Sequence, residues 1–530
     1  MDSPEQWLLS AEERGNPHTT LPAWTEGNLA EPLLHGSTYF DRLVEEVRSL
    51  NAGDHLFFTD WRGDPDERLR EDGPTVVELF TEAVKKGVCV RGLVWRSHMS
   101  RMSLNKEANR ALDQEIEHGG GEVILDQRIR RMGSHHQKFV VLRHDEDPSK
   151  DVAFVGGIDL CYSRRDDADH HGDPQALPMA SAYGPNPPWH DVQLMLHGPA
   201  VHVLDTVFRE RWDDPNSPDE DHPIAWVHDK LNRTRMHADP LPPQLPPPPE
   251  CGPHLVQTLR TYPAIRPPYD FAPDGERSVA RGYTKAIKRA QRLIYLEDQY
   301  MWSAEVARLF AEALEAHPDL QLVVVVPRVP DQEGAFAERP QLIGRWQAIE
   351  MCKSAGQNRV HVFDVENHEG TPVYVHAKVC VVDDLWVSVG SDNFNRRSWT
   401  HDSELSSAVL DTTRDPREPR DPAGTGEGAR TFARDLRLQL AREHLDLAPD
   451  GSEDEEVLDV DRFVRVLKER AEALDAWHEA GRVGPRPPGR LRPHRAEKLN
   501  LFTRLWATPI YRLLDDPDGR PLRLRLKKDF

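Results

Sequence analysis

Apolar and polar positions alternate along the chain with two periods, one typical of helices and one of strands. Apolar residues recur every three or four positions in stretches that we predict as amphipathic helices, at 37–53, 75–87, 201–212, 278–291 and 431–445. Short and nearly continuous apolar runs lie at 55–61, 88–95, 138–142, 152–157, 292–298, 320–327, 378–383 and 386–391. Strands that alternate with helices of this length indicate an α/β fold with a largely covered sheet.

A proline-rich run, DPLPPQLPPPPE at 239–250, divides the chain into two halves. Because proline cannot continue a helix or a central strand, we expect a stiff, extended linker here. The expected organisation is an N-terminal extension at 1–36, a first lobe at 37–238, the linker at 239–252, a second lobe at 253–446 and a C-terminal extension at 447–530. Near the end, the alternating run LRLRLKK favours an edge strand with a basic face over a contact with anionic lipid headgroups.

The two halves carry the same pattern of residues. Each has a His-x-Lys triplet that opens an apolar strand, followed by a turn, a second apolar strand and a pair of small residues. The first copy consists of His136, Lys138, Gly156 and Gly157, and the second of His376, Lys378, Gly390 and Ser391. A repeat of this size predicts two similar domains that meet at a pseudo-twofold axis.

The repeated triplet suggests phosphate chemistry. Residues two apart on a strand point to the same face, so the histidine and lysine of each copy are expected side by side. Two lysines in one pocket would hold a phosphate diester by charge and hydrogen bonds. Two histidines would supply a nucleophile and an acid for the leaving alcohol. A carboxylate usually orients such a histidine, and the candidates are Asp191 and Glu404, each followed by an apolar stretch.

Composition narrows the function further. The chain has 530 residues and a net charge of −22, which disfavours nucleic acid as a partner because that surface needs many basic groups. Its five cysteines are scattered and are expected to be reduced. We see no signal peptide and no apolar run long enough for a transmembrane segment, so we expect a cytoplasmic protein, with export by a route that needs no signal peptide left open.

On these residues the sequence resembles the phospholipase D superfamily, whose signature is a paired HxKxxxxD motif followed by Gly-Ser-x-Asn. The second copy is complete, with His376, Lys378, Asp383, Gly390, Ser391 and Asn393. The first copy departs from it: Arg143 stands at the aspartate position, and Gly157 and Asp159 replace the serine and asparagine. The segments 156–167, 188–201 and 294–302 resemble the lipid-acting branch, and the resemblance runs from about residue 37 to 446.

The resemblance implies two α/β/α sandwich lobes related by a pseudo-twofold, with the active site at their interface. His136 would attack phosphorus to give a phosphohistidine, and His376 would protonate the leaving alcohol and then activate water or a second alcohol. The expected catalytic residues are His136, Lys138, His376, Lys378, Asp383, Asp191 and Glu404, and the expected substrate-binding residues are Gly157, Asp159, Ser391, Asn393 and Gln299. Family members use no metal or other cofactor in this step.

The function expected from the resemblance is hydrolysis or transfer at the headgroup ester of a glycerophospholipid, met at a membrane surface. Alternatives are a phosphatidyltransferase of the cardiolipin synthase kind, a nuclease of the same superfamily and a relative that binds lipid without catalysis. Two motifs in one chain are enough for a complete site, so we expect a monomer. The sequence names neither the headgroup nor the preferred acceptor.

Other polar and aromatic residues have plainer interpretations. His135 faces the opposite side of its strand, so a pocket-edge or packing residue is favoured there over a second catalyst. The pair His170 and His171 lies among aspartates, and a solvated acidic loop is favoured there over a metal site. Glu297 fits a pocket wall and a strand exit equally well on physical grounds. Trp61 is expected in the core rather than at a lipid-facing wall.

Overall fold

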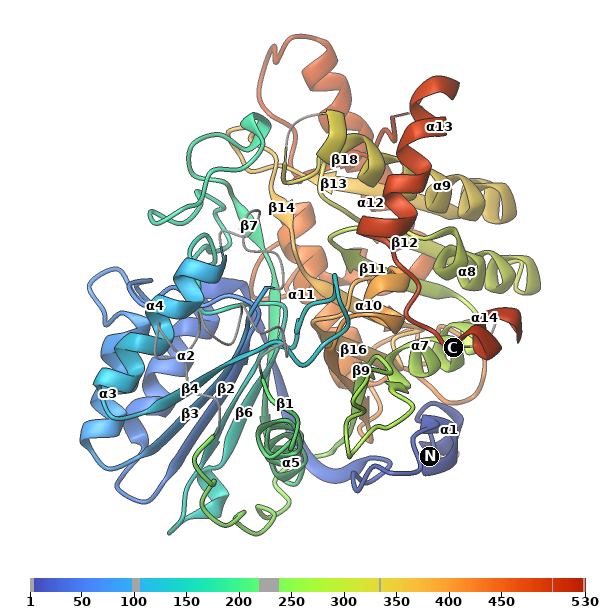
Figure 1. The fold of residues 1–530 in the computed structure, drawn as a ribbon. Helices are drawn as coiled ribbons and strands as arrows, with labels where there is room; N and C mark the ends of the chain where they lie inside the picture. Colours follow the sequence, from blue (N-terminus) through green and yellow to red (C-terminus); the bar gives the residue numbers. More distant parts are fainter. Residues whose placement is uncertain (1–3, 98–104, 219–237, 333–334, 498, 528–529) are drawn as a thin grey trace.

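Each half of the chain forms a mixed sheet, and in the computed structural model the two sheets join edge to edge (Figure 1). The structure describes residues 4–97, 105–218, 238–332, 335–497, 499–527 and 530. At the join, β1 (Thr25–Leu34) runs antiparallel to β9 (His254–Tyr262), pairing Thr25 with Val256 and Asn28 with His254. The pairing of these two first strands is the geometry that a pseudo-twofold axis requires.

The strands on either side of the join follow the same order. From β1 outward the N-terminal lobe has β8 (Val192–His197), β6 (Val152–Gly156), β5 (Phe139–Arg143), β2 (His55–Asp60), β3 (Cys89–Trp95) and β4 (Glu122–Asp126). From β9 outward the C-terminal lobe has β17 (Glu404–Asp411), β16 (Trp386–Gly390), β15 (Lys378–Val382), β11 (Leu293–Asp298), β12 (Gln321–Val325) and β13 (Val360–Val365). The repeat seen in the sequence is therefore a repeat of topology, and the expected pair of α/β lobes is confirmed.

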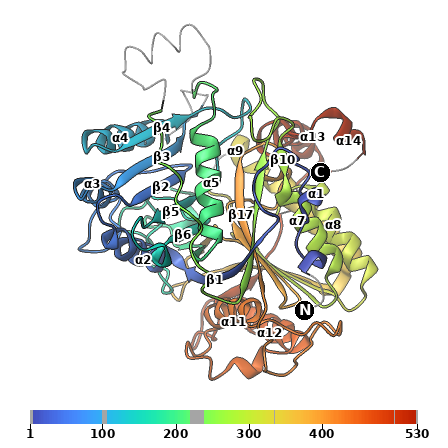
Figure 2. The same ribbon diagram turned by 90° about the horizontal axis from the view of Figure 1, so that it is seen from below.

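Helices cover both faces of the joined sheet. One face carries α2 (His35–Ser49), α3 (Val76–Lys85) and α4 (Asn105–His118) in the first lobe, and α7 (Ser278–Arg289), α8 (Ala304–Ala316) and α9 (Ala335–Gly356) in the second. The other face carries α5 (Ala200–Trp212), α11 (Thr431–Leu445) and α12 (Val460–Glu479), as the view in Figure 2 shows. The five helices predicted from the sequence all form.

Alternation along the strands explains this layering. In β2, Phe57 packs in the core under α5, whereas its neighbours Leu56 and Phe58 pack in the core under α2 and α3. Successive side chains of a strand point to opposite faces, so a run that is apolar throughout must be covered on both sides. The short apolar runs of the sequence fold in this way.

Some expectations about the ends of the lobes are wrong. The strand β1 precedes residue 37, the expected start of the first lobe, yet it pairs with β8 in that lobe's sheet and joins it to β9 of the second lobe. Likewise β18 (Leu491–Pro493), inside the expected C-terminal extension, pairs with β13. The run LRLRLKK is not an edge strand, because Leu522–Lys527 forms helix α14 with Leu524 buried; Lys528 lies outside the described residues.

The proline-rich segment has no helix or strand and runs along the first lobe. Buried or half-buried arginines anchor its carbonyl groups: Arg143 donates to Leu245 and Pro246, and Arg209 donates to Pro242. Three of the cysteines are buried, Cys89 is half-buried and Cys251 is exposed, all as free thiols. Among the described residues, no helix combines the length and the apolar character needed to cross a membrane.

Candidate active site

Backbone hydrogen bonds connect the two lobes next to the repeated motifs. A short parallel pair of strands, β7 (Trp189–His190) and β14 (Tyr374–Val375), bridges them at the centre of Figure 1. The backbone N–H of His376, just after β14, donates to the carbonyl of His190 at 2.8 Å. On the other motif, the N–H of His136 donates to the carbonyl of Ser403 at 2.9 Å. Each motif histidine is thus fixed to the opposite lobe.

The carboxylates that orient the histidines also come from the opposite lobe. His136 Nδ1 lies 2.9 Å from Glu404 Oε2, and His376 Nδ1 lies 2.7 Å from Asp191 Oδ2. A carboxylate on Nδ1 accepts the proton of that nitrogen and leaves the Nε2 lone pair for chemistry. Both carboxylates are fully buried, and each lies on Nδ1 of its histidine, so in their ionised form they favour the same tautomer in each motif.

The motif lysines are buried next to their histidines. Lys138 Nζ donates to the carbonyl of His136 at 3.0 Å and lies 3.6 Å from Asp159 Oδ1. Lys378 Nζ donates to the carbonyl of His376 and to Gln299 Oε1, the latter at 3.3 Å. In each motif, therefore, the ammonium group of the lysine lies next to the histidine of the same motif. Two buried cations with so few acceptors make a strong site for an anion.

Burial and neighbouring charges shift the pKa values of the motif histidines and of Lys378. Burial lowers the pKa of His136 and of His376 well below the usual range, and the two lysines lower both values further. Burial also lowers the pKa of Lys378, to about 8, and the nearby Lys138 adds to that shift. Since each histidine feels the lysine of the other copy, all four side chains share one electrostatic environment.

The Gly157 and Ser391 positions explain how two different acids serve equivalent roles. Ser391 Oγ donates to Glu404 Oε2 at 2.5 Å. At the matching place in the first copy, a Cβ on Gly157 would lie only 2.2 Å from Asp191 Oδ1. The absence of a side chain there lets the shorter aspartate approach His376. Both residues thus position the carboxylates, and their contact with substrate stays a prediction.

The expected catalytic place of Asp383 is wrong. Its carboxylate accepts the backbone N–H groups of Gln291, Arg292 and Leu293 at 2.7–2.8 Å, at the end of β15 opposite to Lys378. At about 3.3 Å per residue, five residues of strand separate it from the lysine by roughly 16 Å. It holds the start of β11 and does not reach the pocket.

In the first copy Arg143 stands at the aspartate position, and Asp54 supports the neighbouring strand instead. Arg143 is fully buried and pairs with Asp151 and Asp205 at 2.7 Å each. The start of β2 is instead held by Asp54, which accepts the backbone N–H groups of Asn51 at 2.7 Å and Asp145 at 2.9 Å. Although the motif aspartate is absent from this copy, His136 and Lys138 keep their contacts with Glu404 and Asp159.

The remaining expected binding residues lie around the lysines. Asp159 accepts the N–H groups of Trp61 and Arg62 and faces Lys138. Gln299 donates to the hydroxyl of Tyr374 at 2.8 Å and steadies Lys378. Asn393 is buried, and its Oδ1 has no hydrogen-bond partner among the described residues.

Two tryptophans flank the histidines. Trp61 is half-buried, stacks on Trp95 and has its ring 6.1 Å from that of His136, so its expected place in the core is wrong. Trp189 lies 4.9 Å from the ring of His376 and carries Arg164 over its face at 3.9 Å. Sequence reasoning missed Trp189 and Arg164, although Trp189 is two residues before Asp191.

The other interpretations have mixed outcomes. His135 is buried and bonded to Ser403 Oγ at 2.7 Å, as expected for a packing residue. Glu297 does not line the pocket, because it is buried behind it and accepts from His190 and His444. The solvated acidic loop is wrong for His170, which is fully buried, while His171 is exposed.

Comparison with known proteins agrees with this geometry. Residues 65–238 match the family model described as Phospholipase D, and residues 283–414 match the one described as Cardiolipin synthase, PLD-like domain. The chain belongs to the phospholipase D superfamily. Its curated relatives are in the lipid-acting branch, and each of the two matched segments holds one His-Lys pair.

The relatives include phospholipase D alpha 1 of Vigna unguiculata, 25% identical, and of Nicotiana tabacum, 27% identical. These alignments cover 79% and 78% of this chain and 66% and 65% of the relatives, so the chain spans just under two thirds of their length. Among solved structures, phosphatidylserine synthase of Haemophilus influenzae Rd KW20 aligns with a TM-score of 0.49 and 13% identity, over 72% of this chain and 82% of that one.

Proposed function

We propose that this protein is a phospholipase D-type phosphodiesterase that cleaves the headgroup ester of glycerophospholipids through a phosphohistidine. The observation that carries the proposal is the crossed pairing of the two histidines with Glu404 and Asp191. A relative that merely bound lipid would have no need for two buried histidines held in matching tautomers. The net charge of −22 argues against the nuclease alternative.

In the first step, Nε2 of His136 attacks phosphorus and the bond from phosphorus to the headgroup oxygen breaks. His376 must enter this step protonated on both ring nitrogens, with Asp191 holding the Nδ1 proton; it gives the Nε2 proton to that oxygen, and the headgroup leaves as an alcohol. The lysines neutralise the charge on the non-bridging oxygens. The assignment of His136 as nucleophile agrees with its greater side-chain exposure, 15% against 6% for His376.

In the second step, His376 takes a proton from water, the oxygen attacks phosphorus and the bond from phosphorus to His136 breaks. The product is a phosphatidic acid, and both histidines return to their starting state. A primary alcohol in place of water would give a phosphatidyl alcohol. Transfer of this kind is the second candidate function, favoured by the match of residues 283–414 to the cardiolipin synthase model.

Exposed apolar side chains near the end of the chain suit contact with a phospholipid membrane. The C-terminal residues 501–526 carry large apolar side chains that are between 48% and 77% exposed, namely Leu501, Phe502, Leu505, Leu513, Leu514, Leu522 and Leu526. We call these seven residues the C-terminal apolar surface; they lie on α13 (Leu501–Ile510), η6 (Tyr511–Asp515) and α14. Exposed Arg512, Arg523 and Arg525 are interleaved with them, as expected for contact with phosphate headgroups.

This surface is tied to the segments that carry the first motif and Glu404. Arg397, in α10 (Arg396–Thr400), donates to the carbonyls of Leu514 and Met132, both at 2.7 Å. Arg130, six residues before His136, donates to the carbonyl of Gly519 at 2.8 Å. These contacts join the backbone at Leu514 and Gly519 to the segments that lead into the first motif and into Glu404.

The experiment is release of choline from phosphatidylcholine vesicles by the wild type and by His136→Ala and His376→Ala, with and without EDTA. Release in the wild type that either substitution abolishes is the expected result. A matched control, His118→Ala at the exposed end of α4, is expected to leave the rate unchanged. Added primary alcohol tests transfer. No release from a panel of phospholipids by the folded wild type would contradict the proposal.

A further inference from the structure

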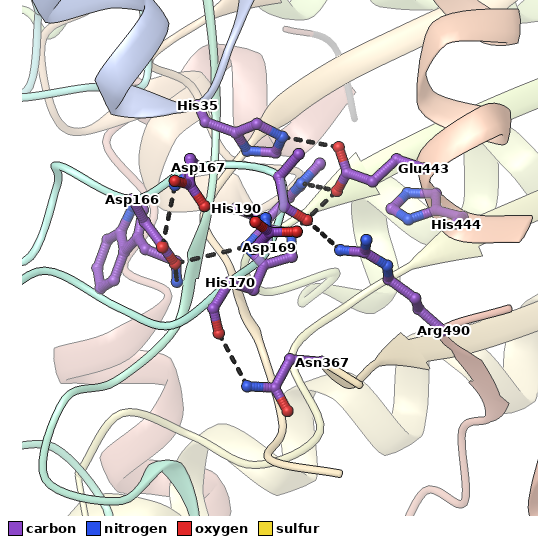
Figure 3. A network of polar contacts seen from close by, with 12 residues as sticks. His35, Asp166, Asp167, Asp169, His170, His190, Asn367, Glu443, His444 and Arg490 are labelled. Carbon is purple, nitrogen blue, oxygen red and sulfur yellow. Dashed lines mark hydrogen bonds and ion pairs between the residues drawn. The ribbon is translucent and has the colours of Figure 1, made fainter. Parts of the chain in front are cut away.

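A second cluster of buried polar side chains lies behind the reaction pocket. His35 begins α2, His170 lies in the loop after β6, His190 ends β7 and Glu443 belongs to α11, so both lobes contribute. Their nearest nitrogen and oxygen atoms all lie within 4.8 Å of one another. Figure 3 shows the three imidazoles converging on the carboxylate of Glu443.

The contacts inside this cluster are short. Glu443 Oε2 lies 2.7 Å from His35 Nε2, and Oε1 lies 2.9 Å from His170 Nε2 and 3.1 Å from His190 Nδ1. Side-chain exposure is 7% for Glu443 and 5% or less for the histidines. Water is therefore excluded from a centre that holds four potential metal ligands.

The outer nitrogens of two histidines fix where the protons are. His190 Nε2 lies 2.6 Å from Glu297 Oε2, and His170 Nδ1 lies 3.4 Å from Asp166 Oδ2. An ionised carboxylate only accepts, so each outer nitrogen carries hydrogen. A neutral imidazole then turns a lone pair, not a proton, toward Glu443. Without a cation, the same contacts require additional protons at the centre, either on the inner nitrogens of these rings or on Glu443.

We propose that His35, His170, His190 and Glu443 bind one zinc ion. Three imidazole nitrogens and one carboxylate oxygen make a closed set of four ligands, the coordination of a structural zinc site. Calcium and magnesium prefer oxygen ligands and fit this set poorly. Glu297 and Asp166 then act as the outer carboxylates that commonly orient metal-bound histidines.

The zinc would brace the segment that carries Asp191. The N–H of His35 donates to the carbonyl of Asp191 at 2.9 Å, and the carbonyl of His190 accepts from His376 at 2.8 Å. Two ligands thus hold the backbone on either side of the carboxylate that orients His376. This zinc takes no part in the bond-making steps, so the expectation that those steps use no metal stands apart from it.

The test is elemental analysis of the purified full-length protein, followed by stripping with a strong chelator and titration of zinc back into it. We expect about one zinc per chain, a lower melting temperature after stripping and recovery at one equivalent. Substoichiometric zinc after growth in zinc-supplemented medium, with no stoichiometric uptake by the stripped protein, would overturn the proposal. Metal content is independent of lipase activity, so failure of either proposal leaves the other untouched.

Variants separate ligation from folding. Glu443→Gln and His170→Ala are expected to lose the zinc, whereas His494→Gln, which alters another buried histidine bonded to an aspartate, is expected to keep it. His170→Cys retains a ligand, and its cobalt derivative is expected to show the sulfur-to-cobalt absorption band that the wild type lacks. A folded His170→Cys protein that takes up cobalt without this band would contradict ligation at His170.

Discussion

The carboxylate of Asp191, from the N-terminal lobe, lies 2.7 Å from Nδ1 of His376, from the C-terminal lobe. The reciprocal pair, Glu404 and His136, lies 2.9 Å apart. Neither lobe therefore contains a complete histidine–carboxylate pair, and packing of the two lobes forms both pairs at once. Fixing the two tautomers in this way is the structural basis of the proposed two-step chemistry.

Replacing Asp191 by asparagine tests this relationship. The amide keeps the size but donates where the carboxylate accepted, which favours the wrong tautomer of His376. We expect kcat to fall by about 10²–10⁴-fold, the range that a positioned general acid contributes. Steady-state choline release measures it, with circular dichroism as the folding control. A rate within about threefold of wild type would show that Asp191 does not orient His376.

Gly157→Ala tests the close approach of Asp191. The added Cβ would lie 2.2 Å from Asp191 Oδ1, so the carboxylate must move away from His376. We expect a loss of stability of about 1–3 kcal/mol, typical of overpacking, together with a larger loss of activity. Urea unfolding and kinetics on the same preparation compare the two. Wild-type kinetics in this variant would show that the glycine is not needed for the pair.

The alkaline side of the pH profile tests the charge on Lys378. Burial lowers its pKa to about 8, and a lysine is charged only below its pKa. We expect kcat/KM to fall as the pH rises through this value, because the pocket then loses one of two phosphate-binding cations. Lys378→Arg stays charged at every accessible pH, so any activity that it retains is expected not to fall as the pH rises through about 8. If kcat/KM of Lys378→Arg fell at alkaline pH as in the wild type, the fall would belong to the titration of another group.

The double substitution Phe502→Asp with Leu505→Asp tests the C-terminal apolar surface. Both side chains are 76% exposed, so the fold is expected to tolerate the change, while carboxylates oppose contact with lipid. We expect weaker sedimentation with vesicles and slower hydrolysis of them, with little change on a monomeric short-chain lipid. Val483→Asp, also 76% exposed but outside this surface, is the matched control. Equal vesicle binding by all three proteins would contradict a membrane role.

Arg143→Met tests the buried ion-pair cluster that stands at the position of the motif aspartate. The change leaves the carboxylates of Asp151 and Asp205 buried without their shared cation. Removing one partner of such a group costs about 3–5 kcal/mol, so a clear drop in the denaturation midpoint is expected. Arg48→Met, on the exposed face of α2, is expected to change it little. A midpoint equal to wild type would show that this cluster adds no stability.

The sequence was enough to predict the lobes and the two His-Lys pairs, because these features are local. Strand periodicity and the triplet spacing are visible within a few residues, and their repetition 240 positions later reveals the second lobe. The two acids were also recognisable, each at the start of an apolar stretch. Which acid serves which histidine depends on how the lobes pack, and no local pattern encodes that.

The same reason explains the wrong expectations. His170 looks like part of a solvated loop among aspartates, but Glu443, 273 residues away, lies 2.9 Å from its ring. In LRLRLKK the alternation suggests a strand, yet Leu522 and Leu526 are four apart and exposed together on one short helix. Asp383 fits the family motif, and only the structure shows that three backbone N–H groups donate to its carboxylate.

The most direct test of the central claim is to trap the covalent intermediate. Wild-type protein is mixed with a short-chain phosphatidylcholine, quenched within one turnover and digested, and the peptides that contain His136 and His376 are compared by mass spectrometry. The proposed mechanism predicts a phosphatidyl adduct on His136 and none on His376. An adduct on His376, or product formation in the His136→Ala protein at the wild-type rate, would contradict it.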